Sequence, residues 1–163
     1  MKKWSFLLTA AILLTACNSE EAKPPQEESQ EHAGHAHATG DIQEETQSAD
    51  MLPGFLDKQT DMVRAAYQIA GHAPEVLEWM PCYCGCGESA GHESNLNCFI
   101  QEIKDDGAIV WDDHGTRCNV CIEIAVGSVK MHQEGKSLKE IRQTIDDAYK
   151  DGYAQPTDTK MPA

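Results

Sequence analysis

The chain has 163 residues, and its 27 acidic side chains outnumber 13 Lys and Arg, giving a formal net charge of −14. Such an acidic chain lacks the basic surface that binds phosphate backbones, so we expect no nucleic-acid partner. The length allows one domain, and the aromatic content of 6% predicts a small core that needs support beyond apolar burial.

The first 17 residues have the pattern of an export signal. Two lysines precede an apolar run from Trp4 to Leu14, which is too short to span a bilayer. The sequence LTAC that ends at Cys17 resembles the lipobox of bacterial lipoproteins. This resemblance implies cleavage before Cys17, lipidation of that cysteine, and a lipid-anchored protein on the extracytoplasmic face of the cell membrane. An ordinary secretory signal is the alternative interpretation.

Residues 18–50 are acidic, contain prolines and offer little to bury, which predicts a disordered linker. Within the linker, His32, His35 and His37 lie in a short tract of alanine and glycine. Histidine-rich tracts of this kind can capture metal weakly, so we treat these three as auxiliary metal ligands. The alternative is a solvated linker that contains histidines by chance.

The folded domain is expected over residues 51–153. Residues 52–71 carry apolar side chains at helical spacing, among them Val63 and Tyr67, and residues 73–81 predict a short helix that ends at Pro81. Three further helices are expected at residues 91–107, 116–135 and 137–153. Their N-terminal caps would be Ser94, Thr116 and Ser137.

These segments predict an all-α fold, a small bundle of four or five short helices organised around a cysteine-rich loop. Residues 108–115 are too short and mixed for a firm assignment, although the AIVW stretch carries the one hint of a strand. Residues 154–163 are polar and are expected to form a loose tail.

Cysteines are the most distinctive feature of the sequence. Residues 81–87 read PCYCGCG, and six cysteines other than Cys17 fall within 40 consecutive positions: Cys82, Cys84, Cys86, Cys98, Cys118 and Cys121. Disulfides between alternate cysteines would close very small, strained rings. Longer-range pairings are geometrically open, so a disulfide-stapled domain is an alternative.

A metal site suits the spacing better than short-range disulfides. Cys118 and Cys121 are one helical turn apart at an expected helix start, where the helix dipole favours the thiolate that binds metal. Gly85 and Gly87 allow the motif loop to bend so that several sulfurs point inward. One tetrahedral Zn(II) would leave two of the six thiolates over, whereas Cu(I) accepts two or three sulfurs and shares them between ions. We therefore expect Cu(I), with Zn(II) as the alternative.

Other side chains near the cysteines are auxiliary candidates. Of His72, His92 and His114, each a ligand or a surface residue, His114 is the best candidate because it precedes Cys118 by four positions. Met80 offers a thioether that Cu(I) accepts, although core packing is the commoner role of methionine.

The motif Pro81–Gly87, with the later cysteines and the lipobox, resembles the PCYCGCG-motif lipoproteins of Bacillus-like bacteria. The likeness covers the region around Cys17 and residues 52–153. Because that family is largely undescribed in function, the resemblance implies placement outside the cytoplasm and little about mechanism.

From the residues we predict an extracytoplasmic protein that binds soft metal for sequestration or for hand-over to a donor or acceptor protein. The alternative is a disulfide-stapled interaction module of the cell envelope or spore. A thiol oxidoreductase is less favoured, because the Cys118–Cys121 spacing lacks the βαβ surroundings of thioredoxins. No nucleophile–base pair or phosphate-binding loop stands out, so we predict that the protein is not an enzyme.

Overall fold

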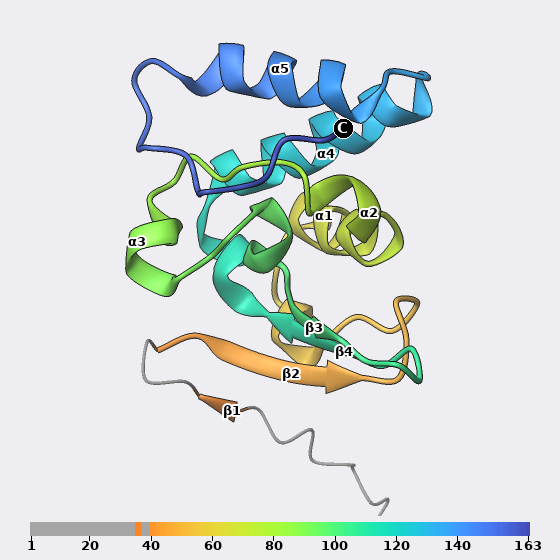
Figure 1. The fold of residues 1–163 in the computed structure, drawn as a ribbon. Helices are drawn as coiled ribbons and strands as arrows, with labels where there is room; N and C mark the ends of the chain where they lie inside the picture. The colour runs from red at the N-terminus through yellow and green to blue at the C-terminus, as the bar shows by residue number, and fades with distance from the viewer. Residues whose placement is uncertain (1–34, 37–39) are drawn as a thin grey trace, which may run out of the picture. The chain divides into compact units, whose positions relative to one another are not determined.

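The computed structural model describes residues 35–36 and 40–163 (Figure 1). The chain divides into residues 1–30 and 31–163, and every described residue belongs to the second unit. The predicted signal, the lipidation site Cys17, and His32 and His37 lie outside the described residues. Of His35, only the backbone position in strand β1 (His35–Ala36) is described.

The fold is mixed α/β, so the prediction of an all-α bundle is wrong. A four-stranded antiparallel sheet has the order β1-β2-β4-β3. The strands are β1 (His35–Ala36), β2 (Ile42–Thr46), β3 (Ile100–Ile103) and β4 (Ile109–Asp112). Figure 1 shows the helices on one side of this sheet, with α5 (Leu138–Tyr149) stacked beyond α4 (Asn119–Gln133).

Strand β3 lies where a helix was expected, and strand β4 lies where no element was assigned. Residues 91–107 form a short 3-10 helix, η2 (Asn95–Cys98), followed by β3 instead of one α-helix. The spacing of Phe99, Ile100 and Ile103 fits a helix locally. Pairing with β4, in which Ile100 lies opposite Trp111, outweighs that local preference.

The boundaries of the folded part also differ from the expected ones. Strand β2 lies inside residues 18–50, which composition predicted to be a disordered linker. Its residues Gln43, Glu44 and Thr46 are buried, although they are polar. Polar composition concealed this strand because its side chains find hydrogen-bond partners, such as Trp111 Nε1, which donates to Thr46 Oγ1 at 2.7 Å.

The remaining elements are helical. They are η1 (Gly54–Leu56), α1 (Asp61–His72), α2 (Pro74–Leu77), α3 (Cys86–Ala90), η3 (Asp113–Arg117), α4 and α5. The capping box predicted at Ser137 and Glu140 is present at the start of α5. Thr116 does not cap α4, because it lies within η3 and its hydroxyl donates to the carbonyl of Asp113, so α4 begins later, with Cys118 as its N-cap.

The core holds an aromatic cluster between helix and sheet. Tyr67 on α1 packs edge-on against Phe99, with ring centroids 5.1 Å apart, and lies against Trp111 at 6.1 Å. All three side chains are fully buried. The Tyr67 hydroxyl donates to the carbonyl of Asp112 at 2.7 Å, which fixes the end of β4 relative to α1.

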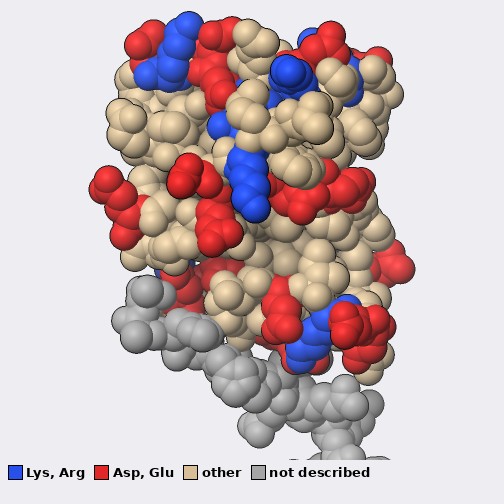
Figure 2. Space-filling model, viewed as in Figure 1, with Lys and Arg blue, Asp and Glu red and all other residues tan. Residues whose placement is uncertain are grey.

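A second apolar cluster joins α4 and α5 to the motif loop. It contains Met80, Tyr83, Ile124, Ile141 and Ile145. No helix among the described residues is both long and apolar enough to traverse a lipid bilayer. Figure 2 shows Asp and Glu side chains in several separate groups on one face of the protein, with Lys and Arg between them.

Gly115 in η3 provides a test of how tightly this core is packed. A Cβ added there would lie 2.8 Å from a ring carbon of Phe99 and 2.9 Å from the carbonyl oxygen of Cys98. We expect Gly115→Ala to lower the free energy of unfolding by about 1–3 kcal/mol, because neither neighbour can move freely. The urea midpoint measures this.

Gly127 in α4 is the matched control, since a Cβ there meets nothing within 4 Å. Gly127→Ala should stabilise the protein by roughly 0.5–1 kcal/mol through helix propensity. A Gly115→Ala protein as stable as the wild type would contradict the packing described here.

Candidate metal centre

The cysteines of the motif lie where the backbone turns from an irregular segment into α3. Gly85 has φ of 90° and is the N-cap of α3, so the chain reverses between Cys84 and Cys86. A side chain at this φ would be strained, which explains the glycine. The turn keeps the sulfurs of Cys82, Cys84 and Cys86 within 4.8 Å of one another.

Two other segments bring their cysteines to the same place. Cys98 comes from the end of η2, and Cys118 and Cys121 come from the start of α4. The Sγ atom of Cys82 lies 3.2 Å from that of Cys84, 3.3 Å from that of Cys121 and 3.7 Å from that of Cys98.

The remaining sulfurs extend this cluster on both sides. Cys86 and Cys98 are 3.7 Å apart, and Cys84 and Cys121 are 3.6 Å apart. The sulfur of Cys118 also belongs to the cluster, because it lies within 4.8 Å of the sulfurs of Cys84 and Cys121. The structure therefore brings all six predicted cysteines into one continuous set, which we call the sulfur cluster.

The sulfur–sulfur distances suit metal ligation. All six cysteines are free, and the separations of 3.2–3.7 Å exceed the length of a disulfide bond, about 2.05 Å. Four thiolates around a tetrahedral ion at about 2.3 Å would lie roughly 3.8 Å apart, by the geometry of a tetrahedron. The sulfur cluster thus approaches the spacing of metal-bound thiolates.

Burial shields most of the sulfur cluster. Cys82, Cys86, Cys98 and Cys121 are at most 1% exposed and pack within the main apolar core, whereas Cys84 and Cys118 are half-buried. The half-buried pair therefore forms the solvent-facing edge of the cluster.

Thiols at this spacing cannot all ionise together, because like charges repel. A hydrogen bond with Cys121 is the main cause that lowers the pKa of Cys82 to about 4, and a bond with Cys121 also lowers the pKa of Cys86 to about 2. The pKa of Cys84 is lowered chiefly through Cys118. Hydrogen bonding within the cluster thus favours the thiolate form at the three motif cysteines.

The pKa of each of the other three cysteines is raised, which favours the thiol form. Hydrogen bonding to Cys118 is the largest cause that raises the pKa of Cys121. For Cys98 and Cys118, a bond from Cys121 favours the thiolate, but the other neighbouring sulfurs and burial outweigh it and raise the pKa. Metal binding would replace these shared protons with a cation.

Two histidines adjoin the sulfur cluster. His114 lies beside Cys84, and hydrogen bonding to that sulfur is the main cause that raises the His114 pKa to about 9. His92 is 8% exposed, and its Nδ1 lies 3.5 Å from the sulfur of Cys98. The histidine rings meet edge-on with centroids 4.7 Å apart.

Sequence reasoning preferred His114 and left His92 open between a ligand and a surface residue; the structure buries His92 beside Cys98. The sequence feature that pointed to His92 was its position five residues after the motif and next to Gly91. The left-handed conformation of Gly91 ends α3 and turns the chain back toward the cysteines. His72 pairs with the exposed Asp50 at 3.3 Å, and His132 is exposed.

Met80 is fully buried, but its neighbours are those of the second apolar cluster, such as Ile124 and Ile141. The main core that includes four of the cysteines is a separate cluster. This position supports the packing role for Met80 over the role of an auxiliary ligand.

The segment that was expected to be a loose tail is hydrogen-bonded to the motif. The Cys82 N–H donates to Thr157 Oγ1 at 2.9 Å, and the Thr157 N–H donates back to the Cys82 carbonyl at 3.0 Å. Ala154 donates to the carbonyl of Tyr83 at 3.1 Å. Polar composition gave no sign of this, because the bonds are made largely by the backbone.

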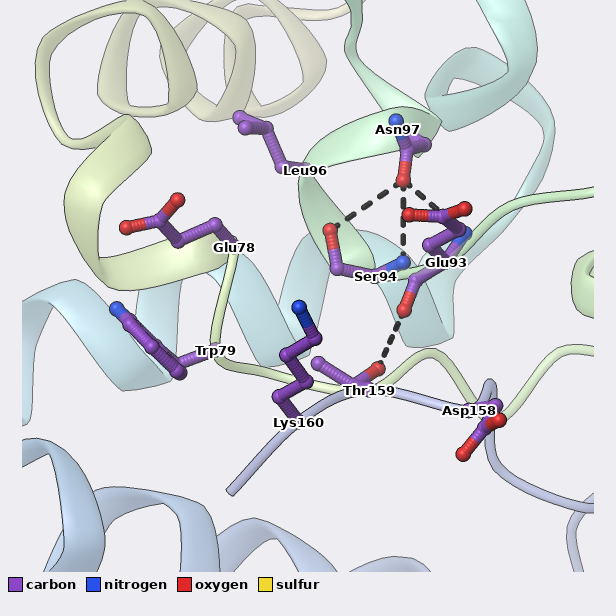
Figure 3. A pocket seen from close by; sticks show the side chains of 9 residues that line it. All are labelled: Glu78, Trp79, Glu93, Ser94, Leu96, Asn97, Asp158, Thr159 and Lys160. Carbon is purple, nitrogen blue, oxygen red and sulfur yellow. Dashed lines mark hydrogen bonds between the residues drawn. The ribbon is translucent and has the colours of Figure 1, made fainter. Parts of the chain in front are cut away.

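Figure 3 shows the next part of this segment beside a pocket. The Thr159 hydroxyl donates to the carbonyl of Glu93 at 2.6 Å, and Lys160 extends along the pocket toward η2. Asn97 accepts from the backbone of Glu93 and Ser94 at 3.1 Å each. No cysteine lines this pocket, so it is distinct from the sulfur cluster.

Residues 6–162 match the model of a family described as proteins of unknown function with a PCYCGC motif. The chain belongs to this family. No curated protein and no solved structure matches the chain significantly. The motif is the one feature that the family's description names.

The burial pattern predicts the order in which thiols react. In reduced, metal-free protein, iodoacetamide should modify Cys84 and Cys118 before the other four cysteines, because those four are at most 1% exposed. Peptide mass spectrometry over a time course measures the order. Equally rapid modification of Cys98 or Cys121 would contradict the described burial.

The bond between Thr157 and the motif can be tested by removing one oxygen. Thr157→Val leaves the buried Cys82 N–H without a partner, so we expect a loss of about 1–3 kcal/mol in the free energy of unfolding. Thr144→Val is the control, because the Thr144 hydroxyl is exposed and bonds within α5. A midpoint unchanged in both variants would show that the segment does not stabilise the motif.

Proposed function

We propose that this protein binds soft metal through the sulfur cluster, with Cu(I) held by several shared thiolates. The observation that carries the proposal is the overlap of its ligand sets. Cys82, Cys98 and Cys121 form one triangle of sulfurs, and Cys84 and Cys118 form another with the same Cys121. The Cys121 sulfur belongs to both triangles, and a thiolate that bridges two ions would occupy such a shared position.

The number and arrangement of the sulfurs favour Cu(I) over Zn(II). A structural zinc site closes with four ligands around one ion and would leave two of these sulfurs unused. Cu(I) is soft and binds two or three thiolates, so triangles that share corners suit more than one Cu(I). The motif supplies a third triangle, formed by Cys82, Cys84 and Cys86.

A role in sequestration or hand-over accounts for the graded exposure of the cluster. Cys84 and Cys118 are half-buried, so thiols of a donor or acceptor protein can reach the ions at this edge. The four cysteines behind them are shielded from solvent and oxidants. We propose a binding role, with no catalysis.

The proposed location is the extracytoplasmic face of the cell membrane, through a lipid on Cys17. This rests on the resemblance of the LTAC sequence to a lipobox. The histidine tract at His32, His35 and His37 would then capture metal weakly and pass it to the cluster.

The test is metal uptake by protein purified without oxygen. Native mass spectrometry should find more than one Cu(I) per chain, with all six thiols reduced before loading. Cys82→Ser should lower the Cu(I) number more than Cys118→Ser does, because the Cys82 sulfur contacts three others within 3.7 Å. Met80→Leu is the control and should leave the number unchanged.

Three outcomes would contradict the proposal. Protein with free thiols that takes up no Cu(I) would exclude the function. A single tightly bound Zn(II) that Cu(I) does not displace would identify a zinc site. An intact mass lower by two protons per cysteine pair would support the disulfide-stapled module.

A further inference from the structure

A second group of possible ligands lies next to the sulfur cluster and contains no sulfur. His92 follows α3, Asp112 ends β4 and His114 is in η3, and one ligand atom from each lies within 4.8 Å of the other two. Asp112 is 2% exposed and His92 is 8% exposed. We call these three residues the histidine–aspartate group.

The group contains a buried nitrogen without a hydrogen-bond partner. His114 Nδ1 is inaccessible to solvent and makes no hydrogen bond among the described residues. Asp41 Oδ1 lies 3.6 Å from this Nδ1, which is an ion-pair distance. A buried ring nitrogen left without a partner is costly unless something else satisfies it.

The carboxylate of Asp112 is buried with neutral partners. Gln43 Nε2 donates to Oδ2 at 3.0 Å, and the His114 N–H donates to Oδ1 at 2.9 Å. Among the described residues, no Lys or Arg lies within salt-bridge distance of this carboxylate, because Arg117 pairs with Asp41 and Asp113. A carboxylate oxygen retains capacity for a further ligand after accepting one bond.

The charge around the group favours a cation. Asp41, Asp112 and Asp113 are all buried, and the Arg117 guanidinium pairs with Asp41 and Asp113. Arg117 and the His114 ring, whose pKa is raised, stand against these three carboxylates, so negative charge remains in excess in a site of low exposure. Burial of such an excess is expensive unless a positive ion compensates it.

We propose that His92, Asp112 and His114 form a second metal site for a borderline divalent cation such as Zn(II). Two imidazoles and one carboxylate are a donor set that suits such ions and leaves a position open for water or another ligand. The soft thiolates of the sulfur cluster select a different class of ion. The contact between His92 Nδ1 and Cys98 makes the two sites neighbours. This site does not depend on Cu(I) being the ion of the sulfur cluster.

The experiment uses Co(II) as a probe, because its visible spectrum separates thiolate ligands from nitrogen and oxygen ligands. The full chain with His32, His35 and His37 changed to Ala serves as the parent, so the linker cannot bind the probe. The sulfur cluster is loaded first with Cu(I), and Co(II) is then added. We expect one Co(II) per chain without a sulfur-to-cobalt charge-transfer band.

Variants identify the ligands. His92→Gln and His114→Gln should each lower the affinity for Co(II) at least about tenfold, since removing even an indirect partner of a metal ligand costs about 10–100-fold. His132→Gln is the matched control, because His132 is exposed on α4 and should leave Co(II) binding unchanged. Urea midpoints verify that the variants fold.

A second readout needs no variant at these positions. In the parent protein, Co(II) should broaden and shift the ring-proton resonances of two histidines, His92 and His114, while those of His72 and His132 stay in place. No Co(II) uptake, a sulfur-to-cobalt band, or shifts at His72 or His132 alone would overturn the proposal. Failure of Cu(I) loading would count against the proposed function, whereas the Co(II) spectrum of the same sample still reports on the histidine–aspartate group.

Discussion

The close approach of sulfur atoms in a dry environment is the constraint on which this structure depends. Cys82 lies within 3.7 Å of three other sulfurs, and all four belong to different turns of the chain or different segments. Without a shared proton or cation, ionised thiols at this spacing would repel one another and separate the segments that hold them. The motif loop, η2 and the start of α4 therefore depend on what lies between the sulfurs. The charge on the sulfur cluster therefore affects the packing of the domain directly.

The sheet contributes to this centre indirectly. Tyr67 holds the end of β4 through its bond to the Asp112 carbonyl, and Asp112 in turn accepts a bond from the backbone of His114. Gly115 lets the chain pass close to Phe99 and the carbonyl of Cys98. A strand end, a 3-10 turn and a cysteine segment thus share one packing arrangement. The histidines meet the sulfurs because a sheet, absent from the expected fold, fixes where β4 stops.

Local signals identified the cysteines and two of the three expected caps, Ser94 and Ser137, because these depend on residues near in sequence. The capping box at Ser137 follows from side chains three positions apart. Strand β3 could not be found this way, since its apolar spacing also fits a helix and only its pairing with β4 decides. The burial of His92 could not be predicted for a similar reason, because it depends on the turn at Gly91 and on the distant His114. The sequence shows which residue types could bind metal, whereas the tertiary structure decides which of those residues lie next to one another.

The hydrogen bonds between Cys82 and Thr157 join residues that are 75 positions apart. A ribosome makes the motif long before it makes Thr157, so the backbone of Cys82 has no native partner while the nascent chain is still growing. The native hydrogen bonds beside the sulfur cluster therefore form late, after synthesis has passed Thr157. Such timing would keep the native arrangement of Cys82 from forming on an incomplete chain.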